Sequence, residues 1–482
     1  MRHHRGARGT ALEYKKVSSV DYGDFVASKL TRAAPTGMAE VPALHPSLFP
    51  FQSDLVGWAL RRGRCALFAD TGLGKTRMQL EWAKHVAALA GDVLILAPLS
   101  VASQTANEAK QLGMSVTLCR EAGDVRPGVN ITNYDRLHKF ATPQFVGVVL
   151  DESSCIKHYN SKTLAALMAA FGDTPWKLCC TATPSPNDYV ELGTHAAFLG
   201  VCTQVEMMSE YFCVDRTDIT WRLKGHARDA FWKFVASWGA MLRKPSDLGY
   251  DDERYALPPL RTHHHVSKAD QALTFASGVL FATEATDLMD RRRARKDSLS
   301  SRVESCAKMV NADKNTWVLW CDLNAESDAL AAAIPGSVEV RGSLDLDEKE
   351  RILDSFARGE IRVLISKASI TGFGLNWQHA HHMAFVGVTD SWEAYYQAVR
   401  RCWRFGQTKP VDVHVFASEV EGSVIKNLER KGKDAMKMAE ELSRETGSAL
   451  RAEVLGSKRG AHPYNANTAM VVPSWVKSGD EQ

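Results

Sequence analysis

Short apolar runs alternate with helix-like stretches in the first half of the chain. Five runs between residues 46 and 195 are mostly apolar: CALFA, VLILAPL, VNITNY, FVGVVLD and KLCCTATP. Continuous apolar runs are typical of strands in a parallel sheet, because both faces of such strands are covered. Helix-like segments such as KTRMQLEWAKHVAALA lie between several of them. The alternation predicts a doubly wound α/β domain over residues 46–195.

The same alternation returns after residue 301, in the runs TWVLWCDL, SVEVRG, IRVLISKAS, HHMAFVGV and VDVHVFAS. These runs predict a second α/β unit over residues 301–420. We expect residues 196–300, which contain few such runs, to form a helical connector. Residues 1–45 would be an N-terminal extension, and residues 421–482 a charged, helix-prone segment that becomes polar. The predicted fold is two doubly wound parallel-sheet lobes joined by a helical connector.

Composition sets the class of protein. The 482 residues are 45% hydrophobic and 24% charged, as in ordinary globular proteins, and the net charge is only +3. Nucleic acid would therefore have to bind in a local groove. Apolar runs stay well short of the roughly 20 residues that a membrane helix needs, and the N-terminus lacks the apolar core of a secretory signal. The ten cysteines show no C-x-x-C spacing. We therefore expect a monomeric protein of a reducing cytoplasm, without zinc or disulfides.

The segment FADTGLGKTRM follows the apolar stretch CALF and precedes a helix pattern. Gly72 and Gly74 allow a tight turn that brings backbone N–H groups close to phosphates. Lys75 can reach the β- and γ-phosphates, and the Thr76 hydroxyl can bind Mg²⁺. Ala69 stands where the longer phosphate-loop pattern has glycine, so the match is to the core G-x-G-K-T. The segment predicts an ATP site formed by Thr71, Gly72, Leu73, Gly74, Lys75 and Thr76.

The stretch FVGVVLDESS has two interpretations. Asp and Ser are favoured N-cap residues, so the strand could simply lead into a capped helix. A phosphate-loop ATPase, however, needs a second strand that ends in acidic residues. Asp151 would then bind Mg²⁺, and Glu152 would orient or deprotonate the attacking water. Ser153 and Ser154 could cap the next helix, link this site to the downstream TATP, or do both.

Ordered motifs resemble those of superfamily-2 helicases, and among them the Swi/Snf-like translocases. In the first half, the family's motifs I, Ia, Ib, DExx box and III are similar to ADTGLGKT, LAPLSVASQ, ITNYDRL, VVLDESS and CTATPSPN. ELGTHAAFLG, which comes next, resembles a further Swi/Snf-like pattern. The DExx box here ends in two serines, where the family usually has Ala-His. The resemblance implies two RecA-like lobes, ATP hydrolysis with Mg²⁺, and a compact form of bacterial or phage type.

The second half carries similar segments. GFGLN resembles part of motif V, through Gly372, Gly374, Leu375 and Asn376. YYQAVRRCWRFGQTKPV resembles motif VI, with Gln397, Arg401, Arg404, Gly406 and Gln407 at matching positions. Arg400 stands where the family usually has glycine. Since Arg401 and Arg404 are three residues apart, they could share one helix face. They would act as arginine fingers, unless they only form a solvated helix face.

The resemblance also assigns further nucleotide contacts. Gln52 resembles the glutamine that reads adenine, since its amide can both donate and accept; an exposed helix glutamine is the alternative. Gly374 and Gln397 would also contact the nucleotide.

Nucleic acid is the partner that the resemblance implies. Small polar residues would bind its backbone without reading sequence; these are Ser100, Gln104, Thr132, Asn133, Thr371 and Gly372. We expect an ATP-dependent translocase on DNA, more readily on duplex than on single strands. Two alternatives stay open: an RNA helicase, and an ATP-gated clamp that recruits a nuclease or a replication or recombination partner. The unusual Ser153-Ser154 pair keeps the clamp in consideration.

Three other features have simpler interpretations. The run THHH at 262–265 is expected to be a strand or surface segment, because partner ligands for a metal are not seen at useful spacing. The run DRRRARKD could grip phosphates or form a solvated helix face. Trp221, Trp232 and Trp238 could stack on bases, although packing against a lobe is favoured.

Overall fold

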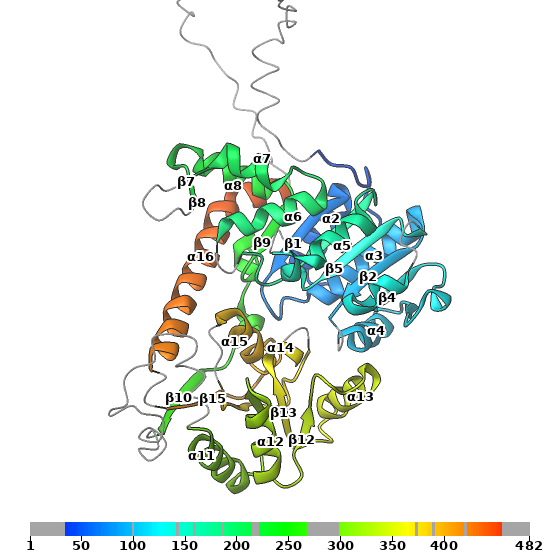
Figure 1. The fold of residues 1–482 in the computed structure, drawn as a ribbon. Helices are drawn as coiled ribbons and strands as arrows, with labels where there is room; N and C mark the ends of the chain where they lie inside the picture. The colour runs from blue at the N-terminus through cyan, green and yellow to red at the C-terminus, as the bar shows by residue number, and fades with distance from the viewer. Residues whose placement is uncertain are drawn as a thin grey trace, which may run out of the picture.

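Two parallel sheets organise the described residues of the chain. The computed structural model describes residues 34–98, 101–140, 144–157, 161–185, 188–214, 221–267, 298–371, 375–387, 391–418 and 422–455. Each sheet with its covering helices forms one lobe. Lobe 1, at the top of Figure 1, contains the N-terminal strands, and lobe 2 lies below it. Both predicted α/β units are therefore confirmed.

The sheet of lobe 1 has the order β3-β4-β2-β5-β6-β1-β9, and all neighbours are parallel. Its strands in that order are Val116–Leu118, Val129–Asn133, Val93–Ala97, Gly147–Asp151, Trp176–Cys180, Arg64–Ala69 and Gly239–Leu242. The loops that leave β5, β6 and β1 emerge side by side, because these strands are neighbours and run in the same direction. This edge is where a doubly wound sheet binds ligands.

Helices cover both faces of this sheet. One face carries α2 (Pro50–Arg62), α3 (Lys75–Ala90) and α4 (Val101–Gln111). The other carries α5 (Lys162–Phe171), α6 (Leu192–Leu199), α7 (Gln204–Tyr211) and α8 (Arg228–Ala236). Strand side chains alternate between these two cores, as the pleat requires. Short 3₁₀ helices complete lobe 1: η1 (Ala122–Asp124), η2 (Tyr134–Lys139), η4 (Ser153–Ile156), η5 (Tyr189–Glu191), η6 (Gly225–Ala227), η7 (Pro245–Leu248) and η8 (Glu253–Tyr255).

The sheet of lobe 2 has the order β10-β15-β14-β11-β13-β12, again with parallel neighbours. Its strands in that order are Leu260–Ser267, Val411–Ser418, His382–Phe385, Trp317–Cys321, Val363–Lys367 and Val338–Val340. The helices of this lobe are α11 (Leu299–Ala312), α12 (Asn324–Ala333), α13 (Leu346–Ala357), α14 (Ala368–Thr371) and α15 (Trp392–Val399).

The expected helical connector over residues 196–300 needs correction. This stretch contributes β9 to the sheet of lobe 1 and β10 to that of lobe 2, and a small hairpin is formed by β7 (Phe212–Val214) and β8 (Trp221–Leu223). β9 was missed because GAML is short. β10 was not assigned to a sheet, and its THHH run stayed open between strand and surface segment, because LRTHHHVS is polar, as suits an edge strand with exposed side chains. Each lobe therefore includes part of the expected connector.

The C-terminal helix α16 (Gly422–Val454) is 33 residues long and spans both lobes. It packs against α15 of lobe 2 and against α8, β9 and α2 of lobe 1, and it runs along the left side of the molecule in Figure 1. This helix agrees with the helix-prone character of the segment predicted from residue 421, and residues 456–482 of that segment lie outside the described residues.

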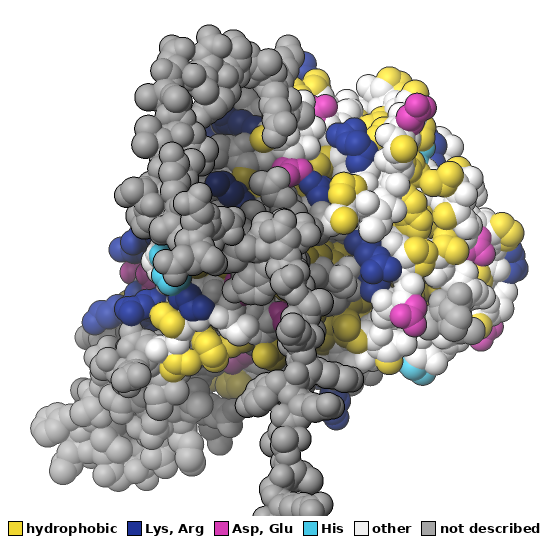
Figure 2. All heavy atoms as spheres, turned by 90° about the horizontal axis from the view of Figure 1, so that it is seen from above, with side chains coloured by type: hydrophobic (Ala, Val, Ile, Leu, Met, Phe, Trp, Pro, Cys, Tyr) yellow, Lys and Arg dark blue, Asp and Glu magenta, His cyan; other side chains and the backbone are white. Residues whose placement is uncertain are grey.

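Several sequence features can now be placed. Trp232 and Trp238 are buried in the core of lobe 1, as the packing interpretation predicts, whereas Trp221 is exposed on β8. His263, His264 and His265 lie on β10, in keeping with a strand. The run DRRRARKD, residues 290–297, lies outside the described residues. Seen from above (Figure 2), Lys and Arg side chains lie at separate places among apolar and acidic ones, in keeping with the small net charge.

Candidate active site

The loop after β1, residues 70–74, leads directly into α3, and we call this loop the cradle. Gly72 and Gly74 have φ angles of 94° and 81°, in the region that favours glycine. A Cβ atom on Gly74 would stand 2.3 Å from Gln52 Nε2, so a side chain at this position would displace the Gln52 amide as well as strain the backbone. Gly74 is the N-cap residue of α3, and Lys75 is the first residue of that helix. The N-terminus of a long helix therefore points its free N–H groups at the loop.

Lys75 lies folded over the cradle. Its Nζ donates hydrogen bonds to the carbonyl oxygens of Ala69, at 2.9 Å, and Asp70, at 3.4 Å. Burial lowers the pKa of Lys75, and the nearby carboxylates of Glu152, Asp70 and Asp151 oppose this effect. Its amine is held where a phosphate on the loop would meet it.

Asp151 and Glu152 stand at the carboxyl end of β5, with exposed fractions of 4% and 7%. Burial raises the pKa of Asp151, and the adjacent Glu152 raises it further. A bound cation would favour the charged form and offset this cost. Glu152 has a φ of 52° and is the only non-glycine residue with positive φ among the described residues. Such strain is commonly retained at functional sites.

The two serines after the acidic pair do not cap a helix with their side chains. Glu152 occupies the N-cap position of η4, without a side-chain capping bond. The Ser153 hydroxyl instead lies 3.1 Å from Nε2 of His195, on α6. The link to the TATP segment starts one residue earlier, since Thr181 Oγ1 donates to Glu152 at 3.4 Å. The capping interpretation of Ser153 and Ser154 was therefore wrong.

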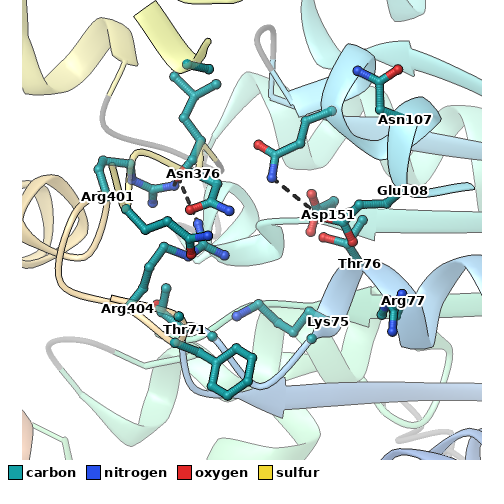
Figure 3. A pocket seen from close by; sticks show the side chains of 18 of the residues that line it. Thr71, Lys75, Thr76, Arg77, Asn107, Glu108, Asp151, Asn376, Arg401 and Arg404 are labelled. Atoms are coloured by element: carbon teal, nitrogen blue, oxygen red, sulfur yellow. Dashed lines mark hydrogen bonds between the residues drawn. The ribbon is translucent and has the colours of Figure 1, made fainter. Parts of the chain in front are cut away.

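Arg401 and Arg404 approach the cradle from lobe 2. The helix α15 ends at Val399, so the expectation that both arginines lie on one helix face was wrong. They converge because each donates from Nη1 to the carbonyl oxygen of Leu375, at 3.0 and 2.9 Å. Gln397 also holds Arg401, through its backbone and side-chain oxygens. The arginines face Lys75, Thr76 and Asp151 across the cavity in Figure 3.

Burial lowers the pKa of Arg401 to about 9, an effect that Glu152 opposes. Burial likewise lowers the pKa of Arg404 to about 10, and Glu108 opposes it. Both guanidinium groups therefore remain charged at neutral pH. The carboxylates that stabilise them belong to lobe 1, so the charges of the two lobes are complementary across the cavity.

One cavity of about 720 Å³ joins these groups. The sequence-predicted residues in its lining are Gln52, Thr71, Gly72, Gly74, Lys75, Thr76, Gln104, Asp151, Glu152, Arg401 and Arg404. Further lining residues that the motifs did not single out include Phe49, Arg77, Asn107, Glu108, Tyr255, Arg358, Gln378 and Phe405. Six of these eight lie within four residues of a sequence-predicted position, whereas Tyr255 and Arg358 lie far from any such position and reach the cavity only through the fold.

Gln52 lines the cavity with its amide already engaged: Nε2 donates to the Leu73 carbonyl at 2.9 Å, and Oε1 accepts from Phe49 N at 3.0 Å. Leu73 itself is buried in the core of lobe 1. Gln397 is fully buried outside the lining and donates to Thr183 at 3.4 Å. These bonds orient the loop and the arginines. Direct contact of Gln52 or Gln397 with a nucleotide stays a prediction.

Two of the expected nucleic-acid residues are buried. Thr132 and Asn133 are each 2% exposed: the Thr132 hydroxyl donates to Cys119 O, and Asn133 caps η2. A phosphate contact through either side chain would require these bonds to break, and the contact stays a prediction. Gln104 lies on α4 and donates to Glu108. Thr371 ends α14, and three further predicted residues lie outside the described part of the chain: Ser100, Gly372 and Gly374.

Comparison with known families agrees with this geometry. Residues 312–406 match the helicase conserved C-terminal domain, which covers most of lobe 2 and includes both arginines. A search of curated proteins gave no match. The match and the two parallel sheets together fit the two-lobe RecA-like fold and support a helicase of superfamily 1 or 2. Within the described residues, no helix is long and apolar enough to cross a membrane.

Proposed function

We propose that this protein is an ATP-dependent translocase on nucleic acid, of the Swi/Snf-like type within superfamily 2, and that DNA is its track. One observation carries the proposal: the glycine cradle, the acidic pair and the two arginines, which come from different lobes, line one cavity. A nucleotide bound in this cavity would contact residues of both lobes at the same time.

The residues present fit ATP with Mg²⁺. The left-handed glycines of the cradle keep side chains away from the loop, as a backbone that must approach phosphates requires. Among the described residues of the lining, Thr71 Oγ1 and Asn376 Oδ1 are buried without a hydrogen-bond partner. The Thr76 hydroxyl and the Asp151 carboxylate supply the oxygen ligands that Mg²⁺ prefers. When bound, the ion would neutralise charge on the phosphates.

Lobe 1 would bind and orient the nucleotide. Lys75 and the loop N–H groups would hold the phosphates, while Gln52 lies beside the loop at the end expected to receive adenine. Glu152 would orient the attacking water and accept its proton. Its left-handed backbone stands where the chain leaves β5.

Lobe 2 would complete the site with Arg401 and Arg404. Such arginines stabilise the charge that develops on the transferred phosphoryl group, a role worth about 10³–10⁵ in rate. Because they belong to the other lobe, hydrolysis and product release would change how strongly the lobes are drawn together. Repeated closure and opening is the physical basis for stepping along DNA.

Steady-state ATP hydrolysis with duplex DNA, single-stranded DNA and RNA tests the proposal. We expect strong stimulation by duplex DNA and displacement of a third strand from a triplex. Stimulation by RNA alone would mean that the protein acts on RNA and not on DNA. ATP hydrolysis that none of the three stimulates would favour the clamp. Lys75→Ala is the control for contaminating activity, since it removes the ammonium that holds the phosphates.

A further inference from the structure

The helix α15 of lobe 2 contacts lobe 1 with one polar face. Glu393, Tyr396, Gln397 and Arg400 are spaced three, four and seven residues from the first, which places them along one side of the helix and its C-cap. All four make hydrogen bonds or ion pairs with lobe 1. The arginines of the active site follow immediately after this helix.

The C-terminal end of α15 holds the start of the phosphate loop. The Arg400 guanidinium lies 3.3 Å from Asp70 Oδ2 and also donates to the Thr71 carbonyl oxygen. The Tyr396 hydroxyl donates to Asp70 Oδ1 at 3.0 Å. Arg400 is 4% exposed, and its guanidinium lies 5.1 Å from the ring centre of Trp403. A buried arginine that is paired, hydrogen-bonded and stacked is fixed in position.

The N-terminal end of α15 holds two other loops. Glu393 forms an ion pair with Lys157, which follows β5, and accepts a hydrogen bond from Thr183 Oγ1 at 3.2 Å. Gln397 donates to the same hydroxyl at 3.4 Å. Thr183 follows β6, so α15 crosses the ends of β5, β6 and β1, which are neighbours in the sheet.

The charges at the two ends have opposite sense. Lobe 1 presents a cation, Lys157, to Glu393 in the first turn of the helix, and an anion, Asp70, to Arg400 at its end. Both helix residues also complement the helix dipole. A helix that slid or turned would break both pairs, so together they define one docking angle. Arg400 stands where the resembling family has glycine, so the family's pattern does not supply this contact.

We propose that the pairs Asp70–Arg400 and Lys157–Glu393 form an interlobe clasp that positions Arg401 and Arg404 over the phosphate loop. This inference rests on the proposed ATPase function. Arg400 is a positioning residue: it reaches Thr71 from the side of α15 and is not among the residues that line the 720 Å³ cavity.

Arg400→Ala tests the clasp by separating turnover from binding. Misplacement of the arginines by about an ångström is expected to lower kcat by roughly 10- to 100-fold. The Kd of a non-hydrolysable ATP analogue should change much less, because lobe 1 keeps its own contacts. Arg400→Lys should recover part of kcat through the charge. Arg351→Ala is the matched control, since Arg351 is exposed and pairs with Glu348 of its own helix.

Paired variants show whether each contact acts as a unit. Asp70→Asn combined with Arg400→Ala should lower kcat no further than the more severe single variant. The same result is expected for Lys157→Gln combined with Glu393→Gln. Effects that multiply in both pairs would overturn the clasp, because they would mean that the partners act independently.

Hydrogen exchange of the same proteins gives a readout that does not need hydrolysis. Arg400→Ala should speed exchange in residues 70–76 and 392–400, while the core strand β2 stays as protected as in Arg351→Ala. Unchanged exchange in both segments, together with unchanged kcat, would overturn the clasp. A wild-type protein without ATPase activity would overturn the proposed function. The hydrogen-exchange comparison alone would then test whether the clasp exists.

Discussion

His195 makes stability depend on pH in a direction that the structure fixes. The side chain is fully buried in lobe 1, with Nε2 lying 3.1 Å from Ser153 Oγ and the ring edge-to-face with Phe68 at 5.2 Å. Burial lowers its pKa from 6.5 to about 4. His195 thereby links α6 to the turn that follows the acidic pair. Protonation of the ring would bury a positive charge, which is unfavourable.

The sign and size follow from proton linkage. Between pH 6.5 and pH 4 the unfolded chain binds a proton at His195 and the folded chain does not, so the stabilisation is complete above pH 6.5 and is lost as the pH falls. With these two pKa values, the loss is about 1 kcal/mol at pH 5.5 and roughly 2 to 3 kcal/mol at pH 4.5.

Urea unfolding of wild type and His195→Gln at pH 7.5, 5.5 and 4.5 measures this loss. Glutamine can keep a hydrogen bond to Ser153 but does not titrate. The wild type's advantage over the variant should therefore shrink, by the amounts given, as the pH falls. His226→Gln, at an exposed histidine of the same lobe, should show a constant difference. A constant difference for His195→Gln as well would refute the buried, neutral ring.

Three changes probe the active site directly. Glu152→Gln should keep ATP binding but stop turnover, leaving a long-lived complex with ATP and DNA in a filter-binding assay; normal hydrolysis would show that another group activates water. Gly74→Ala should raise the Kd for ATP at least tenfold by calorimetry, because its Cβ would meet Gln52 at 2.3 Å in a left-handed backbone. Arg401→Ala and Arg404→Ala should each lower kcat by about 10³ or more, with less effect on ATP affinity; equal losses in kcat and affinity would mean ground-state binding.

The sequence by itself determined most of the strands and the position of the glycine loop. Apolar runs located most strands of both sheets, because a strand covered on both faces must be apolar over its whole length. The core G-x-G-K-T located the cradle, because a backbone with positive φ strongly favours glycine. These are local constraints, and local sequence records them.

The tertiary structure decided what each polar side chain contacts. Polar β10 joins a sheet only because β15 lies beside it. Ser153 could have capped a helix, but its hydroxyl is hydrogen-bonded to His195 of α6 instead. Arg400 looked like a local departure from a motif, and its partner Asp70 lies 330 positions away in the chain. Contacts between the lobes depend on how two separately folded sheets dock, and short-range patterns do not encode that angle.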